Sequence, residues 1–370
     1  MYFHCNNSFH HSVKGHIIVK INQIEKQAEE SFYNCLEGID FVRSIDDVTG
    51  LYDLYIDKVF RVVFQKSKKP KYFLIDIKSN GQPRFARQAV NQLLIYLNDM
   101  EEESYGMFVA PYISSAAAEI CKNNNIGYTD LAGNCYLSFS NVFINKEGNP
   151  NPFKKEKDLK SLFSPKSERL LRVLLNSGPR EWKVADLAET ADISYGLIAK
   201  VKKNLLDREW IEADTVGFQL TKPFVLLSAW TERYTYRKNL VREFYSMQDI
   251  SEIEAAISIN AQDLNIRAGL TGFAGGARLA PAVRYQRVMA YVEDPEKLAL
   301  SMELKEVSSG ANILLLDPYD EGVFYRSQSL GDDGVVSPIQ IYLDLMSITG
   351  RGEEAGEAIM EQIIKKIWSQ

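Results

Sequence analysis

Residues 164–222 decide the fold, because three helical stretches follow one another there: SPKSERLLRVLLNSG (164–178), WKVADLAETA (182–191) and SYGLIAKVKKNLLDR (194–208). Ser164 is a candidate N-cap of the first helix and Gly178 its stop, and Ser194 is a candidate N-cap of the third. The next stretch, REWIEADTVGFQLTKP (208–223), contains two short strand-like runs. Three helices followed by a hairpin, with a tight turn between the second and third, is the order of a winged helix-turn-helix.

The third helix of this region is the candidate DNA-reading element. We expect Leu197, Val201 and Leu205 to form its buried stripe, since they recur at every fourth position. The helix would then enter the major groove with its polar side chains near bases and phosphates. The candidate DNA-binding residues on it are Ser194, Tyr195, Lys200, Lys202 and Lys203. A winged helix that binds protein is the alternative, but Lys and Arg outnumber acidic residues over 154–172, which favours DNA.

Strand-like and helical runs alternate over residues 17–153, which is typical of an α/β sheet. Three of the strand-like runs are LYDLYI (51–56), VFRVVF (59–64) and YFLIDI (72–77). Asp76 and Lys78 leave the last of these strands on the same face, and Asp53 lies on the first. Two carboxylates on neighbouring strands can hold Mg²⁺, while a nearby lysine stabilises charge in phosphodiester cleavage.

This arrangement resembles the core of PD-(D/E)xK nucleases. The helix that follows carries Gln92 and Tyr96 on one face, as in the QxxxY element of RecB-related nucleases, and Glu29 or Glu30 could supply a further acid. If the site is active, its catalytic residues are Asp53, Asp76, Lys78, Gln92 and Tyr96, with Asp53 and Asp76 as the Mg²⁺ ligands. Arg84 and Arg87 in the adjoining turn and helix start could contact DNA phosphates.

Two departures favour an inactive scaffold over an active nuclease. No proline precedes Asp53, and 22 residues separate Asp53 from Asp76, more than a single hairpin needs. A DxK doublet is common by chance, and Gln92 with Tyr96 also fits ordinary helix packing. Such a core can serve as a scaffold that grips DNA without cutting it.

The composition is that of a globular protein, with 45% hydrophobic and 25% charged residues in a chain of 370. A net charge of −6 excludes a surface that is cationic all round, but not a basic patch. We expect a cytoplasmic protein without membrane contact, since no apolar stretch is long enough to span and the N-terminus lacks a signal-peptide core. The four cysteines have no paired spacing, so we expect reduced thiols: Cys5, Cys35, Cys121 and Cys135.

Residues 145–164 form the predicted boundary between the first two domains, since they combine two prolines and a lysine run with no apolar period. The fold class is therefore multidomain α/β and α+β. It comprises a nuclease-like α/β domain over 17–153, a winged helix-turn-helix over 165–222 and an α+β domain over 223–370.

Three stretches resemble the AbiEi-like antitoxin family of transcriptional regulators, in the form with a restriction-endonuclease-like N-terminal region: GMFVAPYISSAAAEICKNNNIGYTDLAGNCYLSF (106–139), SERLLRVLLNSGPREWKVADLAETADIS (167–194) and VVSPIQIYLDLMSITGRGEEAGEAI (335–359). DLAGNC and GRGEEA are the most specific parts. The resemblance implies a DNA-binding repressor of a type IV toxin–antitoxin or phage-defence system, whose partner is a nucleotidyltransferase-like toxin.

Sequence-specific binding of double-stranded DNA by the winged helix is the function that these observations favour. Such a regulator needs no cofactor, and its partners are DNA, the toxin and a second copy of the chain as a homodimer. A Mg²⁺-dependent endonuclease directed by the winged helix is the alternative from a different class. An antitoxin whose C-terminal domain binds a protein partner is the third.

Overall fold

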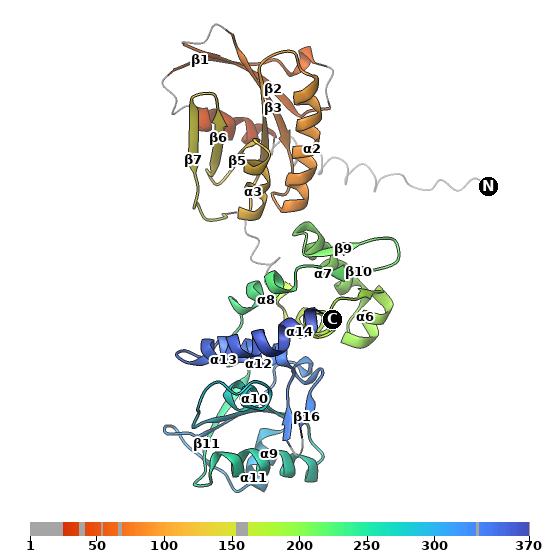
Figure 1. Ribbon diagram of the computed structural model, residues 1–370, viewed down its shortest axis with the longest axis vertical. Helices are drawn as coiled ribbons and strands as arrows, with labels where there is room; N and C mark the ends of the chain where they lie inside the picture. Colours follow the sequence, from red (N-terminus) through yellow and green to blue (C-terminus); the bar gives the residue numbers. More distant parts are fainter. Residues whose placement is uncertain are drawn as a thin grey trace, which may run out of the picture. The chain divides into compact units, whose positions relative to one another are not determined.

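The computed structural model describes residues 25–36, 41–52, 55–65, 69–152, 162–330 and 333–369. The chain divides into two compact units, Met1–Lys155 and Glu156–Gln370, which we describe separately. The described residues form a mixed α/β protein with three sheets, as the alternating sequence pattern predicts (Figure 1).

A seven-stranded sheet forms the first unit, with its strands in sequence order. β3 to β5 run parallel, and the other neighbouring strands pair antiparallel. The strands are β1 (Val42–Asp47), β2 (Lys58–Phe64), β3 (Lys71–Ile77), β4 (Ser104–Ala110), β5 (Gly127–Asp130), β6 (Cys135–Phe139) and β7 (Val142–Lys146).

The strand expected over 51–56 is wrong. Leu51 is the last residue of the 3₁₀ turn η1 (Thr49–Leu51), and the described residues of 51–56 are not in a strand. Asp47 holds the turn, since its Oδ1 accepts hydrogen bonds from the backbone N–H and the hydroxyl of Thr49. Tyr52 then packs against the hydrophobic cluster beneath α2, so the aromatic residues that suggest a strand serve packing instead.

Helices cover both faces of this sheet. A helix over 25–36 lies on one face, where Phe32 stacks on Phe60 with ring centroids 4.8 Å apart. Helices α2 (Pro83–Asp99) and α3 (Ser115–Asn123) lie on the other face. Alternate residues of β3 point to opposite faces, so Phe73 packs with the first helix and Leu74 with α2 and α3.

The expectation of reduced thiols is wrong for Cys35 and Cys135, which form a disulfide between the helix over 25–36 and β6. They lie 100 residues apart in sequence, so no local spacing could reveal the pairing. Cys121 is a free, buried thiol on α3, as expected.

The second unit begins with three helices and a small sheet. The helices are α5 (Pro165–Asn176), α6 (Val184–Ala191) and α7 (Tyr195–Asp207). The sheet is antiparallel in the order β8 (Glu181–Trp182), β10 (Phe218–Leu220) and β9 (Ile211–Ala213). The three helices, β9 and β10 lie where the sequence predicts them, whereas β8 was not predicted and includes Trp182, which the sequence assigns to the second helix.

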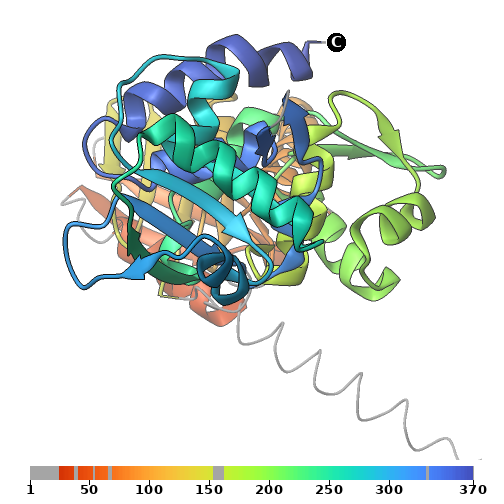
Figure 2. The ribbon, with the colours of Figure 1, turned by 90° about the horizontal axis from the view of Figure 1, so that it is seen from below.

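A seven-stranded mixed sheet forms the rest of this unit, in the order β14 (Lys305–Glu306), β11 (Leu240–Tyr245), β15 (Ile313–Asp317), β13 (Val288–Val292), β12 (Ala268–Thr271), β17 (Asp333–Val335) and β16 (Gln328–Leu330). One face carries α9 (Ile250–Asp263) and α11 (Pro295–Ser301) (Figure 1), and Figure 2 shows α9, in teal, crossing the strands. The other face carries α10 (Gly272–Leu279), α12 (Pro338–Met346) and α13 (Gly352–Ile359).

Shorter segments connect and end these layers. They are α8 (Pro223–Thr231), the 3₁₀ turns η2 (Tyr236–Lys238) and η3 (Glu321–Phe324), the π-helical turn η4 (Met360–Ile364) and α14 (Lys365–Trp368).

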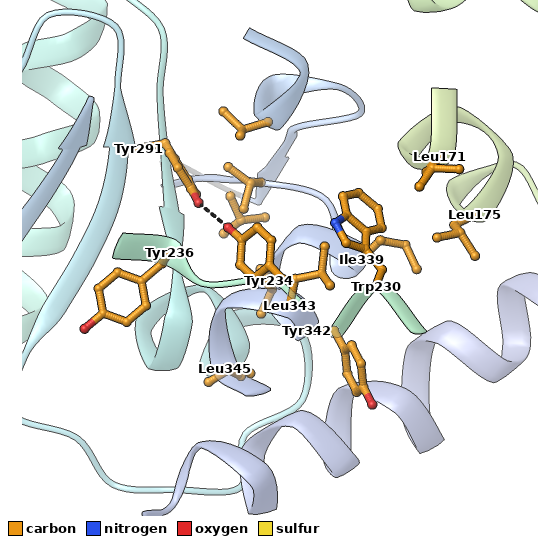
Figure 3. Close-up of a cluster of buried hydrophobic side chains, with 14 of the residues drawn as sticks. Leu171, Leu175, Trp230, Tyr234, Tyr236, Tyr291, Ile339, Tyr342, Leu343 and Leu345 are labelled. Carbon is orange, nitrogen blue, oxygen red and sulfur yellow. Dashed lines mark hydrogen bonds between the residues drawn. The ribbon is translucent and has the colours of Figure 1, made fainter. Parts of the chain in front are cut away.

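One hydrophobic cluster runs through the whole second unit, so the expected boundary between residues 222 and 223 lies inside that unit. Figure 3 shows Leu171 and Leu175 of α5 on the same cluster as Trp230 of α8 and Ile339 of α12. α5 is thus packed directly against the larger sheet's helices.

Mild proteolysis of the full chain should cut first between β7 and Leu162 and leave two folded products. This stretch contains Pro150 and Pro152, has no apolar period, and spans the division between the two units. Asn145 and Lys146, assigned to the boundary from sequence, instead pair with β6 as part of β7. Mass spectrometry of the products checks the site, and a first cut within 165–222 would contradict it.

Candidate functional site

Helix α7 presents one face to the core and the opposite face to solvent. Ser194 caps its N-terminus, where the Ser194 hydroxyl accepts a hydrogen bond from the backbone N–H of Leu197 at 3.4 Å. Ile198, Val201 and Leu205 are buried. The expected stripe is therefore wrong at its first position, because Leu197 is only half-buried and Ile198 replaces it in the core.

The solvent face of α7 carries two lysines and a bare stretch of backbone. Lys200 and Lys203 are exposed one turn apart, and Tyr195 is 62% exposed at the helix start. Gly196 lies on this face one turn before Lys200, and a Cβ added to it would meet nothing within 4 Å. This face, defined by Tyr195, Gly196, Lys200 and Lys203, we call the α7 face.

Lys202 lies on the flank of the helix rather than on the α7 face. Its ammonium is 5.2 Å from the ring centroid of Phe218 in β10, so the side chain packs along the small sheet. Arg180 lies over the Trp182 ring in the same way, at 4.0 Å. Lys202 and Arg180 are therefore each held against an aromatic ring.

The turn between β9 and β10 is fixed by one carboxylate. Asp214 Oδ1 accepts hydrogen bonds from the backbone N–H groups of Val216 and Gly217 at 2.7 and 2.8 Å. The hydrogen bond from Gly217, and next that from Val216, hold the pKa of Asp214 below its usual value. Val216 is exposed at the tip.

Two of the cations counted in the local excess over 154–172 are engaged inside the unit. Arg169 forms ion pairs with Asp320, 2.8 Å from Nε, and with Asp192, 2.9 Å from Nη1. Arg172 is fully buried, and its Nε and Nη2 donate to Gln340 Oε1 at 3.0 and 2.8 Å. Neither side chain is therefore available to DNA, and Arg169 instead fixes the turn before α7.

The contact with Gln340 continues into a buried polar network around Asp344. Tyr234 and Gln340 donate to Asp344 Oδ1 at 2.6 and 3.1 Å, and Tyr234 and Tyr291 contact each other at 3.0 Å (Figure 3). Burial raises the pKa of Asp344, while hydrogen bonds from Thr271 and Tyr234 oppose the rise. This network ties α5 to α12 and β13.

In the first unit, Asp76 is the buried acid of the candidate nuclease-like site. It is 1% exposed on β3, and its Oδ1 contacts the Lys78 ammonium. Asp57 lies just before β2, and its Oδ2 accepts a hydrogen bond from the backbone N–H of Ile77 at 2.6 Å. Burial raises the pKa of Asp76, Lys78 lowers it, and the charge of Asp57 raises it.

Gln92 and Tyr96 form hydrogen bonds with the backbone of Tyr55, two residues before Asp57. Gln92 Nε2 donates to the Tyr55 carbonyl, and the Tyr55 N–H donates to Tyr96 Oη at 3.2 Å. The two α2 side chains thus hold the backbone of the loop.

The structure places the other described residues predicted for this site as follows. Asp53 lies outside the described residues. Glu29 instead forms an ion pair with Lys58 at 2.5 Å. Arg84 and Arg87 are exposed on the first turns of α2.

Sequence reasoning missed Asp57 as the partner of Asp76. Lys58 pairs with Ile75, so Asp57, the residue before β2, lies at the end of β3 where its carboxylate reaches the Ile77 N–H. Two carboxylates offer the hard oxygen ligands that Mg²⁺ takes. Among the described residues, however, no group of three or more His, Cys, Asp or Glu could hold a metal ion, and Lys78 already contacts Asp76.

Residues 219–365 match the model of a family described as transcriptional regulator, AbiEi antitoxin, type IV TA (toxin–antitoxin) system. The match begins in β10 and ends at the start of α14. It therefore does not include α7 or the α7 face, which precede it in the chain. Neither the curated proteins nor the solved structures gave a match. Within the described ranges, no helix has the length and apolarity needed to cross a membrane.

Proposed function

We propose that this protein is a sequence-specific DNA-binding transcriptional regulator of the AbiEi antitoxin type, and that α7 is the helix that enters the major groove. The observation that carries the proposal is the α7 face, where the exposed Lys200 and Lys203 follow the bare backbone of Gly196 on successive turns of the helix. A helix whose outer face includes a residue without a side chain can approach base edges closely, while lysines on the same helix reach phosphates.

The surrounding elements support this assignment of α7. α5, α6 and α7 followed by the β9–β10 hairpin have the order and connections of a winged helix-turn-helix. Ser194 and Tyr195 lie at the N-terminus of α7, where recognition helices contact base edges. The turn of the proposed wing is held in one conformation by Asp214.

The family match supports the regulatory role. From it we propose a nucleotidyltransferase-like toxin as the cognate partner, and a homodimer that binds two half-sites of an operator in the cytoplasm.

Replacing Lys200 and Lys203 together by alanine should weaken binding of the full chain to duplex DNA roughly tenfold or more at moderate salt. Each lost phosphate contact should reduce the slope of log K against log salt by up to about 0.9. Stability should barely change, because both side chains are exposed. The matched control replaces the exposed Lys305 and Lys366, and unchanged affinity and slope for Lys200→Ala/Lys203→Ala would exclude α7 from the groove.

A Mg²⁺-dependent endonuclease is the second candidate, favoured by Asp57 and Asp76 beside Lys78. We propose instead that the first unit is a scaffold of the nuclease-like type that does not cut DNA. The contact of Lys78 with the buried Asp76 and the backbone bond accepted by Asp57 both give these groups structural roles. Arg84 and Arg87 would contact DNA phosphates in the scaffold, and no cofactor is required.

The wild-type protein should not cut DNA with Mg²⁺ or Mn²⁺. Asp76→Asn should stabilise the first unit near pH 7, which would be measured as slower hydrogen exchange of β3. The pKa of Asp76 is raised in the folded state, so ionisation lowers stability as pH rises from the usual aspartate pKa through the raised value. The gain from Asn should therefore disappear at pH below the usual aspartate pKa. Metal-dependent nicking by the wild type that is lost in Asp76→Asn and Lys78→Ala would establish the nuclease instead.

A further inference from the structure

The disulfide of the first unit lies at the wall of a cavity. Cys35 and Cys135 are 3% and 2% exposed, and their Cα atoms lie 6.4 Å apart. Both nevertheless line a cavity of about 340 Å³. The two cysteines therefore form part of the wall that a small molecule in that cavity would contact.

The other residues that line this cavity are mostly polar. They come from the helix over 25–36 and from β5 to β7, and they include Gln27, Glu30, Asn34, Thr129, Asp130 and Lys146. Polar walls favour a hydrated, polar guest over an apolar one. A small peptide-like or zwitterionic thiol has this character.

The disulfide fastens a helix that is otherwise held by few polar contacts. The Ser31 hydroxyl donates to the Asp130 carbonyl at 2.9 Å and contacts the Thr129 hydroxyl at 2.8 Å. Glu29 pairs with Lys58 of β2. The bond therefore joins the helix to the same β5–β6 region that Ser31 contacts.

Cys121 provides a contrast within the same unit. It is fully buried, it does not line this cavity, and burial raises the pKa of its thiol to about 12. A thiol of that kind stays protonated and unreactive at neutral pH. Reactivity in the described part of the unit should therefore be confined to the Cys35–Cys135 pair.

We propose that Cys35–Cys135 is a reversible redox site that a small-molecule thiol reduces from the cavity. The thiolate of the first molecule attacks one sulfur, forms a mixed disulfide and releases the other cysteine as a thiolate, which takes a proton. A second thiol molecule attacks the mixed disulfide and releases the remaining cysteine. Two thiols thus become one small-molecule disulfide, and the protein gains two thiols.

Reduction loosens the helix over 25–36 from the sheet. The bond closes a loop between positions 100 residues apart, and such closure restricts the unfolded chain strongly. The reduced unit should melt roughly 5 to 10 °C lower than the oxidised unit. The redox site is a property separate from DNA binding, and it is tested without DNA. A negative result for the redox site would therefore leave the proposed function untouched, and the reverse also holds.

The test is a titration of the native full chain with mixtures of reduced and oxidised glutathione, followed by alkylation and mass spectrometry. Cys35 and Cys135 should become alkylated together at one two-electron midpoint, while Cys121 stays unlabelled. Hydrogen exchange of residues 25–36 should accelerate at least tenfold at the same midpoint. Cys121→Ala should titrate like the wild type.

Three results would overturn the proposal. Cys35 and Cys135 could be free thiols at every glutathione ratio, in which case they form no redox pair. The disulfide could resist reduction until the protein is denatured, which would make it purely structural. Reduction could also leave the exchange of residues 25–36 unchanged, which would show that the bond does not hold the helix.

Discussion

Gly196→Glu should lower the affinity of the full chain for duplex DNA by at least about 100-fold and leave the fold intact. Gly196 lies on the exposed face of α7, where an added side chain has open space in the free protein. Glutamate has a higher helix propensity than glycine, so the variant should be as stable as the wild type or more so. In the groove, the same side chain would displace base contacts and bring a carboxylate to the phosphates.

Two matched variants separate this effect from a change in charge or helix stability. Gly196→Ala should keep most of the affinity, because a methyl group adds no charge. Leu300→Glu adds the same charge at an 82% exposed position of α11 and should bind DNA as the wild type does. Fluorescence anisotropy with a labelled duplex measures all three, and tight binding by Gly196→Glu would rule out the α7 face.

Arg172→Met should cost the second unit about 3–5 kcal/mol of unfolding free energy. Glu168 is also fully buried on α5, and Arg172 Nη1 lies 3.7 Å from its Oε2. The guanidinium further lies 5.1 Å from the Trp230 ring. Without Arg172, Lys238, at 3.6 Å, is the one ion-pair partner that remains to the buried Glu168 carboxylate among the described residues.

Urea unfolding followed by tryptophan fluorescence measures this cost directly. All four tryptophans, Trp182, Trp210, Trp230 and Trp368, belong to the second unit, so the signal reports on that unit alone. Adding Glu168→Gln should recover part of the loss, because the buried charge disappears with its partner. Arg351→Met, which breaks an exposed pair with Glu354, should leave the midpoint unchanged. A cost below about 1 kcal/mol for Arg172→Met would contradict the structural role assigned to it.

The sequence predicts best the elements whose signals are local. Ser194 caps α7 as its position before an apolar period indicates, and the β9–β10 hairpin follows where two short strand-like runs meet a turn. The prediction that Leu197 belongs to the buried stripe was wrong, because the neighbouring Ile198 also fits a helical period and packs in the core instead.

Features that depend on distant parts of the chain could not be predicted. Asp57 lies near Asp76 through the register of β2 against β3, whereas the sequence assigned the second acid of this site to the run over 51–56, whose described residues are not in a strand. The disulfide and the Arg172–Gln340 contact join residues 100 and 168 positions apart. Such contacts depend on the completed fold and leave no periodic pattern in the sequence.

The most direct test of the account is selection of fragments from genomic DNA by the full-length wild-type protein and by Gly196→Glu in parallel. We expect the wild type to enrich a short recurrent duplex sequence, and Gly196→Glu, folded to the same extent, to enrich none. Enrichment of the same sequence by both proteins, or of no sequence by the wild type, would contradict sequence-specific binding through α7.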